Sequence, residues 1–177
     1  MNTAAKTSLA TRLQALPADV GTWGGAATEA ESVLHGLRQD YPEFDKFLTQ
    51  KFPRLPDAQQ QAILRLIETA QARHCAALLH HWSRQTALSL AIRLRIVTLQ
   101  EALGLPFDAA SRDLLIQAED VRQHLQSQED TWLTATATLP TPWAETAGAL
   151  PLPVTLEVAR DLAATHPTMA MALLRTI

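Results

Sequence analysis

Twelve consecutive residues, HCAALLHHWSRQ at positions 74–85, contain three histidines, a tryptophan and the only cysteine of the chain. Imidazoles and thiolates bind metals and act as bases or nucleophiles, so this segment is the first place to look for chemistry. Two histidines on one helix chelate a metal when they are three or four residues apart. His74 and His81 are seven apart, and His80 and His81 are adjacent. We therefore predict no metal site here and no cofactor.

The apolar residues of the same segment have the spacing of a helix that buries one face. Positions i, i+3, i+4 and i+7 are occupied by Cys75, Leu78, Leu79 and Trp82, which places these four side chains on one side of a helix. A thiol on such a face lacks the accessible, electropositive surroundings of a catalytic cysteine. We therefore predict that the cysteine and the tryptophan belong to the core.

Basic residues accumulate in and after this segment, and no acid occurs between Glu68 and Glu101. The candidate partner-binding residues are Arg73, Arg84, Arg93, Arg95, His80 and His81. Guanidinium groups at this density could line a groove for phosphate, for an acidic helix or for a C-terminal carboxylate. Alternatively, the acidic segment 101–145 neutralises them internally, and we expect this second arrangement.

Length and composition indicate one globular domain over residues 1–177. The chain is 47% hydrophobic and 19% charged, which is typical of a protein with one core. A single cysteine excludes a disulfide framework and predicts a reducing compartment, the cytoplasm. We expect no signal peptide and no membrane span, because no apolar run is long enough. The net charge of −3 argues against nucleic acid as a partner.

The apolar spacing and the positions of glycine and proline predict an all-α fold. Residues 37–103 contain no glycine, and no period-2 alternation competes with the helical pattern. We expect helices over about 4–15, ending before Pro17, and over about 27–38, 73–84 and 86–103, the last with two apolar faces. Asp40 is expected to cap a helix with Pro42 in its first turn, and another helix opens near Pro56. Asp108 is expected to cap a long helix with apolar positions at Leu114, Ala118, Val121, Leu125, Trp132 and Leu139. The proline-rich segment of about 139–153 predicts a loop, followed by two short C-terminal helices at about 154–165 and 168–175.

Residues 57–104 resemble a helical repeat of the HEAT type. The segment ARHCAALLHHWSRQTALSLAIRLRIVTLQEALG at 72–104 has a first helix with one apolar side, a short polar turn and a more apolar second helix. The resemblance implies antiparallel helix pairs stacked as a curved, HEAT-like array, and an irregular helical bundle is the alternative architecture. It also implies protein binding along an extended surface, whereas some relatives of this architecture bind DNA and excise alkylated bases.

Three functions follow from these observations. The first is a non-enzymatic α-helical protein–protein interaction module, a scaffold or adaptor whose partner is another protein. The second is a HEAT-like nucleic-acid-binding or alkylated-base-processing protein that uses the arginine-rich segment 73–95, and the third is a small helical enzyme with no recognisable motif. The oligomeric state stays open. The chain ends in the apolar sequence MALLRTI, so either this helix docks on its own core or the chain is a fragment of a longer protein.

Overall fold

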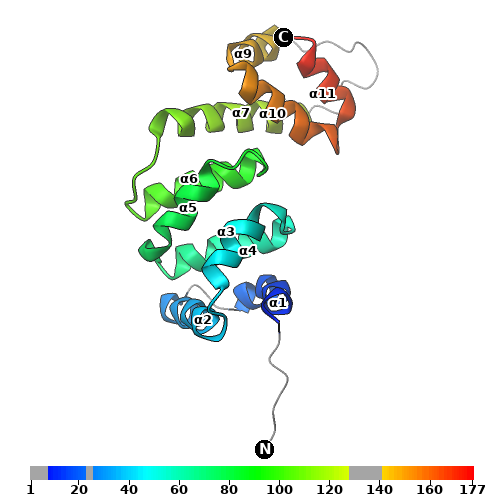
Figure 1. The fold of residues 1–177 in the computed structure, drawn as a ribbon. Coiled ribbons are helices and arrows are strands. Elements are labelled where there is room, and N and C mark those ends of the chain that lie inside the picture. The colour runs from blue at the N-terminus through cyan, green and yellow to red at the C-terminus, as the bar shows by residue number, and fades with distance from the viewer. Residues whose placement is uncertain (1–7, 23–25, 128–140) are drawn as a thin grey trace, which may run out of the picture. The chain divides into compact units, whose positions relative to one another are not determined.

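The computed structural model describes residues 8–22, 26–127 and 141–177, and within these ranges the chain is all-α, as predicted, with no strand (Figure 1). The α-helices are α1 (Leu9–Thr22), α2 (Ala27–Asp40), α3 (Phe44–Lys51), α4 (Asp57–Thr69), α5 (Ala76–Ser83), α6 (Leu90–Ala102), α7 (Ala109–Ser127), α9 (Thr141–Ala149), α10 (Leu152–Ala163) and α11 (Pro167–Leu174). Two short 3-10 helices, η1 (Phe52–Arg54) and η2 (Arg73–Cys75), precede α4 and α5. None of the described helices combines the length and the apolar character that a membrane crossing requires.

The chain forms two compact units. The first unit consists of residues 1–85 and 95–107, and the second unit consists of residues 86–94 and 108–177. The boundary falls within α6, so one continuous helix contributes residues to both units. The single domain over residues 1–177 that the sequence indicates stays a prediction.

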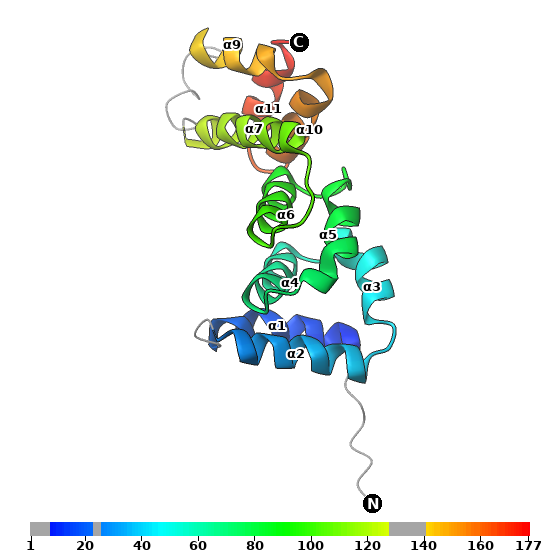
Figure 2. The same ribbon diagram turned by 90° about the vertical axis from the view of Figure 1, so that its left-hand side faces the viewer.

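The core of the first unit is apolar. Helix α4 packs with α1 and with α2, and α3 runs beside α5 (Figure 2). The rings of Phe52 and Trp82 stack with their centroids 3.9 Å apart and their planes 11° from parallel. Both residues are completely buried. The stack joins η1 to α5 and fixes the helix that carries the histidines.

Two expectations near the N-terminal end of the described chain are wrong. Helix α1 continues through Pro17 to Thr22 instead of ending before the proline, because proline removes one backbone hydrogen bond but does not forbid the helical dihedral angles. Asp40 does not cap α3. It is the last residue of α2, and Glu43 occupies the N-cap position of α3 without a side-chain hydrogen bond.

Helix α6 begins at Leu90, four residues later than the sequence indicated, and has two buried faces, as predicted. One face contains Ile92, Ile96 and Leu99, with buried Leu88 just before the helix and buried Leu103 just after it, and the other face contains Leu90 and Val97 with half-buried Leu94. The helix ends in a Schellman motif, in which the Leu105 N–H donates to the Gln100 carbonyl and the Gly104 N–H donates to the Glu101 carbonyl. Gly104 has φ +64°, a conformation that favours glycine.

Asp108 caps α7, as predicted. Its carboxylate accepts the Ala110 N–H at 3.1 Å and the Ser111 hydroxyl at 2.6 Å. These hydrogen bonds, that of Ser111 foremost, lower the pKa of the Asp108 carboxyl. Along α7 the buried stripe contains Ala118, Val121 and Leu125 as expected, whereas Leu115 is buried in place of half-buried Leu114. The expected continuation through Trp132 and Leu139 lies outside the described residues.

The proline-rich segment is not a loop throughout. Residues 141–149 form α9, with Pro142 in the first turn, where proline costs no helical hydrogen bond. Helices α10 and α11 follow as predicted and pack on each other, and α10 also packs on α7. At the end of the chain Met169, Ala172 and Leu173 are buried in the second unit, whereas Met171, Leu174 and Ile177 are exposed.

Candidate functional site

The histidine-rich segment is divided between core and surface, as the spacing predicted. Cys75, Leu78, Leu79 and Trp82 are all buried, and none is more than 8% exposed. His74, His80 and His81 are exposed. No group of three or more histidines, cysteines or acids that could hold a metal ion occurs among the described residues.

The thiol of Cys75 is unsuited to nucleophilic chemistry. Burial raises its pKa, and the nearby Arg38 guanidinium offsets only part of that shift. One Arg38 nitrogen, Nη2, donates to Cys75 Sγ at 3.5 Å and to Asp45 Oδ1 at 2.9 Å. Because only the thiolate is reactive, a buried thiol with a raised pKa is inert at neutral pH.

The four arginines of the basic segment have different surroundings. Arg93 forms an ion pair with Glu157 in the second unit, and Arg95 forms one with Glu68 in the first unit. Arg73 Nη2 lies 3.7 Å from the position that a Cβ would take at Gly104, so this cation lies at the C-terminal end of α6, where the helix dipole favours positive charge. Arg84 is exposed at the end of α5 and has no ion pair among the described residues.

Neutralisation of the basic segment by segment 101–145 stays a prediction, because residues 128–140 of that segment lie outside the described ranges. Two of the arginines are neutralised internally, but their carboxylates belong to Glu68 and Glu157 and not to segment 101–145. In that segment Glu119 binds Arg122, three residues further along α7. Arg122 Nε donates to Glu119 Oε2 at 2.7 Å, and this contact raises the pKa of the guanidinium.

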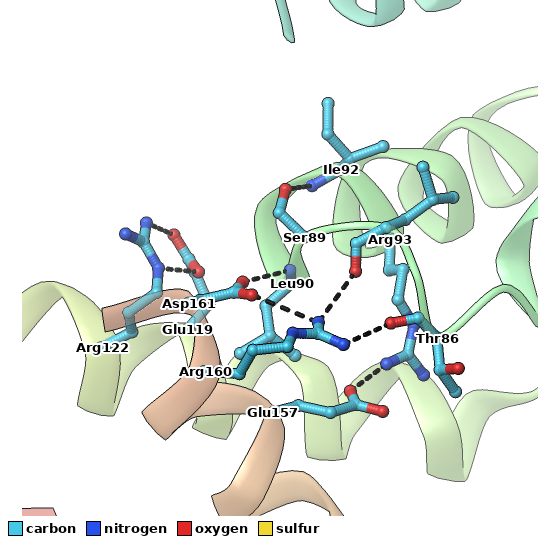
Figure 3. A network of polar contacts seen from close by, with 11 residues as sticks. Thr86, Ser89, Leu90, Ile92, Arg93, Glu119, Arg122, Glu157, Arg160 and Asp161 are labelled. Carbon is cyan, nitrogen blue, oxygen red and sulfur yellow. Dashed lines mark hydrogen bonds and ion pairs between the residues drawn. The ribbon is translucent and has the colours of Figure 1, made fainter. Parts of the chain in front are cut away.

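A polar network in the second unit surrounds the beginning of α6 (Figure 3). The Asp161 carboxylate accepts the Leu90 N–H at 2.8 Å and so caps α6 from α10. Arg160 Nη1 donates to the Thr86 carbonyl at 2.6 Å, and its Nη2 donates to the Leu88 carbonyl at 3.3 Å. Two consecutive residues of α10 therefore satisfy the backbone groups that lead into α6.

The ion pair of this network is mostly buried. The side chains of Arg93 and Glu157 are each 16% exposed. Nε of Arg93 is buried and has no hydrogen-bond partner within the described part of the chain. Removal of one member of such a pair leaves an uncompensated buried charge, which is strongly destabilising.

The exposed apolar side chains gather in the second unit. Six large apolar residues are exposed in the described ranges, and five of them lie on or next to α10 and α11. We call these five the C-terminal apolar face: Leu152, Leu156, Met171, Leu174 and Ile177, which are 39% to 60% exposed. The sixth is Ile116 on α7, 40% exposed.

Sequence reasoning did not identify the C-terminal apolar face as a candidate site. The signal available in the sequence was the high proportion of apolar residues in the last two helices. These helices are short, so one packed face cannot bury every apolar side chain. On α10 Leu152 and Leu156 are one turn apart and flank the buried stripe of Thr155, Val158, Ala159 and Leu162.

Comparison with family models, with curated proteins and with solved structures finds no match to this chain. The candidate site therefore depends on geometry and chemistry alone.

Proposed function

We propose that this chain is a non-enzymatic α-helical protein–protein interaction module whose partner binds the C-terminal apolar face. The observation that carries the proposal is the concentration of exposed apolar side chains on α10 and α11. Single exposed apolar residues are ordinary, but a group of them on neighbouring helices is typical of a surface that a partner covers.

The packing of these helices supports the proposal. Helices α10 and α11 pack on each other, and α10 is also tied to residues 86–90 by Arg160 and Asp161. A surface on such a fixed pair loses little conformational entropy when a partner binds. Stacked helix pairs are also what the HEAT resemblance of residues 57–104 implies, and we retain a HEAT-like array as part of the proposal.

The charges of the second unit support a protein partner over nucleic acid. Residues 86–94 and 108–177 contain five arginines, no lysine and nine acids, a net charge of −4. That charge repels a phosphate backbone, whose neutralisation supplies most of the affinity of nucleic-acid-binding proteins. Of the four arginines in segment 73–95, Arg93 and Arg95 are already paired with carboxylates. The nucleic-acid alternative is accordingly the weaker one.

The test is a matched comparison of surface substitutions. The double variant Leu156→Asp/Met171→Asp places two charges on the C-terminal apolar face, and Ile116→Asp places one charge on an exposed apolar residue outside it. Tagged wild-type and variant proteins are used as bait in an extract of the source cells, and captured proteins are quantified by mass spectrometry. We expect the double variant to lose its specific partner by about tenfold or more, while Ile116→Asp retains it.

Thermal unfolding must show that both variants remain folded. Light scattering on the purified wild type identifies the case in which the partner is a second copy of the chain. If the double variant captures the same proteins as the wild type, in the same amounts, the proposal is wrong.

A further inference from the structure

The first unit contains a groove along α2 that the proposed function does not use. The groove has a volume of about 390 Å³, which is within the usual range for small-molecule sites. Its walls are formed by Thr28, Glu31, Ser32, Leu34, His35, Arg38 and His74. We call it the α2 groove.

One face of α2 supplies nearly all of these side chains. Residues 28, 31, 35 and 38 are spaced by three or four positions, so they lie on one side of the helix. Leu34 is buried and gives the groove an apolar patch. Among the described residues of the wall, His74, from η2, is the one that does not belong to α2.

The positive charge in the groove is already compensated. Arg38 donates to Asp45 Oδ1 through Nε at 3.1 Å and through Nη2 at 2.9 Å, and Nη2 also donates to Cys75 Sγ. These contacts hold the guanidinium in place beside a carboxylate. An anionic ligand would gain little from Arg38 and would be repelled by Asp45 and by Glu31.

The negative charge in the groove is not compensated. Glu31 is exposed and has no ion pair or hydrogen bond to its carboxylate among the described residues. Partial burial, followed by the charge of Arg38, lowers the pKa of His74, so at neutral pH this imidazole is uncharged. A neutral imidazole offers one nitrogen as a hydrogen-bond acceptor.

We propose that the α2 groove binds an alkylammonium group, with the Glu31 carboxylate as its counter-ion. An ammonium group has three N–H donors and no acceptor, and the groove presents the matching acceptors. Beside Glu31 these are the imidazoles of His35 and His74 and the hydroxyls of Thr28 and Ser32. The alkyl stem packs on Leu34. This site uses no residue of the C-terminal apolar face, so the two proposals can be tested independently of each other.

Alkylammonium groups come from two sources, a free small amine or the lysine side chain of a partner protein. The experiment separates them with two probes, n-butylammonium chloride and N-acetyl-lysine N-methylamide, each titrated into the full chain. Binding is followed by NMR shifts of α2 amides and of the His74 ring at about pH 7.5 and about 0.15 M salt, where weak surface attraction is screened. n-Butanol is the uncharged control.

We expect saturable binding of at least one probe with a Kd of about 1 mM or below, and none of n-butanol. In Glu31→Gln the groove loses one charged hydrogen-bond partner, so the variant should bind the probe about tenfold more weakly or worse. The matched control is Glu29→Gln, because Glu29 is exposed on α2 but does not line the groove, and this variant should bind like the wild type.

Preference for n-butylammonium supports a free amine, and preference for the lysine derivative supports a partner's side chain. The proposal is overturned by any of three results: no saturable binding of either probe, equal binding of n-butanol, or unchanged binding by Glu31→Gln.

Discussion

The two units differ in their most buried ion pairs and in their exposed apolar surface. In the first unit the side chains of the ion pairs Arg38–Asp45 and Arg95–Glu68 are all at least 25% exposed. In the second unit no side chain of Arg93–Glu157 or Arg122–Glu119 is more than 18% exposed. The six exposed large apolar side chains of the described ranges also belong to the second unit. The first unit is thus stabilised by an apolar core, whereas the second unit combines buried charge with an exposed apolar surface.

This contrast is consistent with the partner-binding surface that we propose for the second unit. Buried ion pairs contribute little net stability, because the desolvation of both charges offsets their attraction. Removal of one partner is nevertheless costly, because it leaves an unpaired charge in a dry environment. In the second unit Arg93–Glu157 joins residues 86–94 to α10, while the exposed apolar side chains of α10 and α11 stay available at the surface.

The largest expected effect concerns the apolar core of the first unit. Trp82→Ala removes a completely buried ring that stacks on Phe52, and we expect a loss of about 3 to 5 kcal/mol in the free energy of unfolding. Denaturant unfolding measures it. His81→Ala, on the same helix but exposed, is the control and should change the stability by less than about 0.5 kcal/mol.

A second substitution tests the role of the stack itself. The indole N–H of Trp82 is buried and has no hydrogen-bond partner in the described ranges. Trp82→Phe keeps an aromatic ring and removes this unpaired donor, so it should cost clearly less than Trp82→Ala. Equal losses in the two variants would mean that the aromatic ring retained in Trp82→Phe contributes nothing to stability.

The next effect compares the ion pairs of the two units directly. Glu157→Ala leaves Arg93 buried without its carboxylate, and we expect a loss of about 2 to 4 kcal/mol. Glu68→Ala breaks the more exposed pair with Arg95 and should cost less than about 1 kcal/mol. Both values come from denaturant unfolding at the same salt concentration. Similar losses in the two variants would remove the distinction between the units.

A smaller effect concerns Arg84, the exposed arginine in the middle of the basic segment. Arg84 is exposed and has no ion pair among the described residues, so Arg84→Glu should change stability by less than about 0.5 kcal/mol. The thermal midpoint at low and at high salt provides the measurement. A loss of several degrees, removed by salt, would indicate that this arginine is neutralised internally after all.

The smallest effect is a pH dependence in the first unit. Burial and the charge of Arg38 lower the pKa of His74 in the folded chain, so the unfolded chain binds more protons between that pKa and the ordinary histidine value of about 6.5. Folding stability should therefore decrease slightly as the pH falls below about 6.5. An NMR titration should place the pKa of His74 below the ordinary value and show that it rises in Arg38→Met. An unchanged pKa in this variant would contradict the assignment.

The local parts of the fold were predictable from the sequence. The i, i+3, i+4, i+7 spacing of Cys75 to Trp82 identified a buried stripe, and Asp108 was recognisable as a cap because its hydrogen bonds reach only two and three residues ahead. The missed helix α9 has a proline in its first turn, where the residue that usually breaks helices is tolerated.

The partners of the arginines were not predictable in the same way. Arg93 and Glu157 are 64 residues apart, and Arg95 and Glu68 are 27 apart. Opposite charges along a sequence indicate only that pairing is possible, and the packing of whole helices decides which pairs form. For the same reason the sequence could not distinguish Leu156, which is exposed, from Leu162, which is buried on the same helix.

The cap that Asp161 provides for α6 has a consequence for the order of events on the ribosome. The carboxylate that accepts the Leu90 N–H belongs to a residue that is synthesised 71 residues later. At a translation rate of roughly 5 to 20 residues per second, this interval lasts about 4 to 14 seconds. Until then the first turn of α6 has only Ser89, whose hydroxyl accepts the Ile92 N–H. A nascent chain halted before residue 161 thus carries a frayed start to its central helix, where early proteolysis would begin.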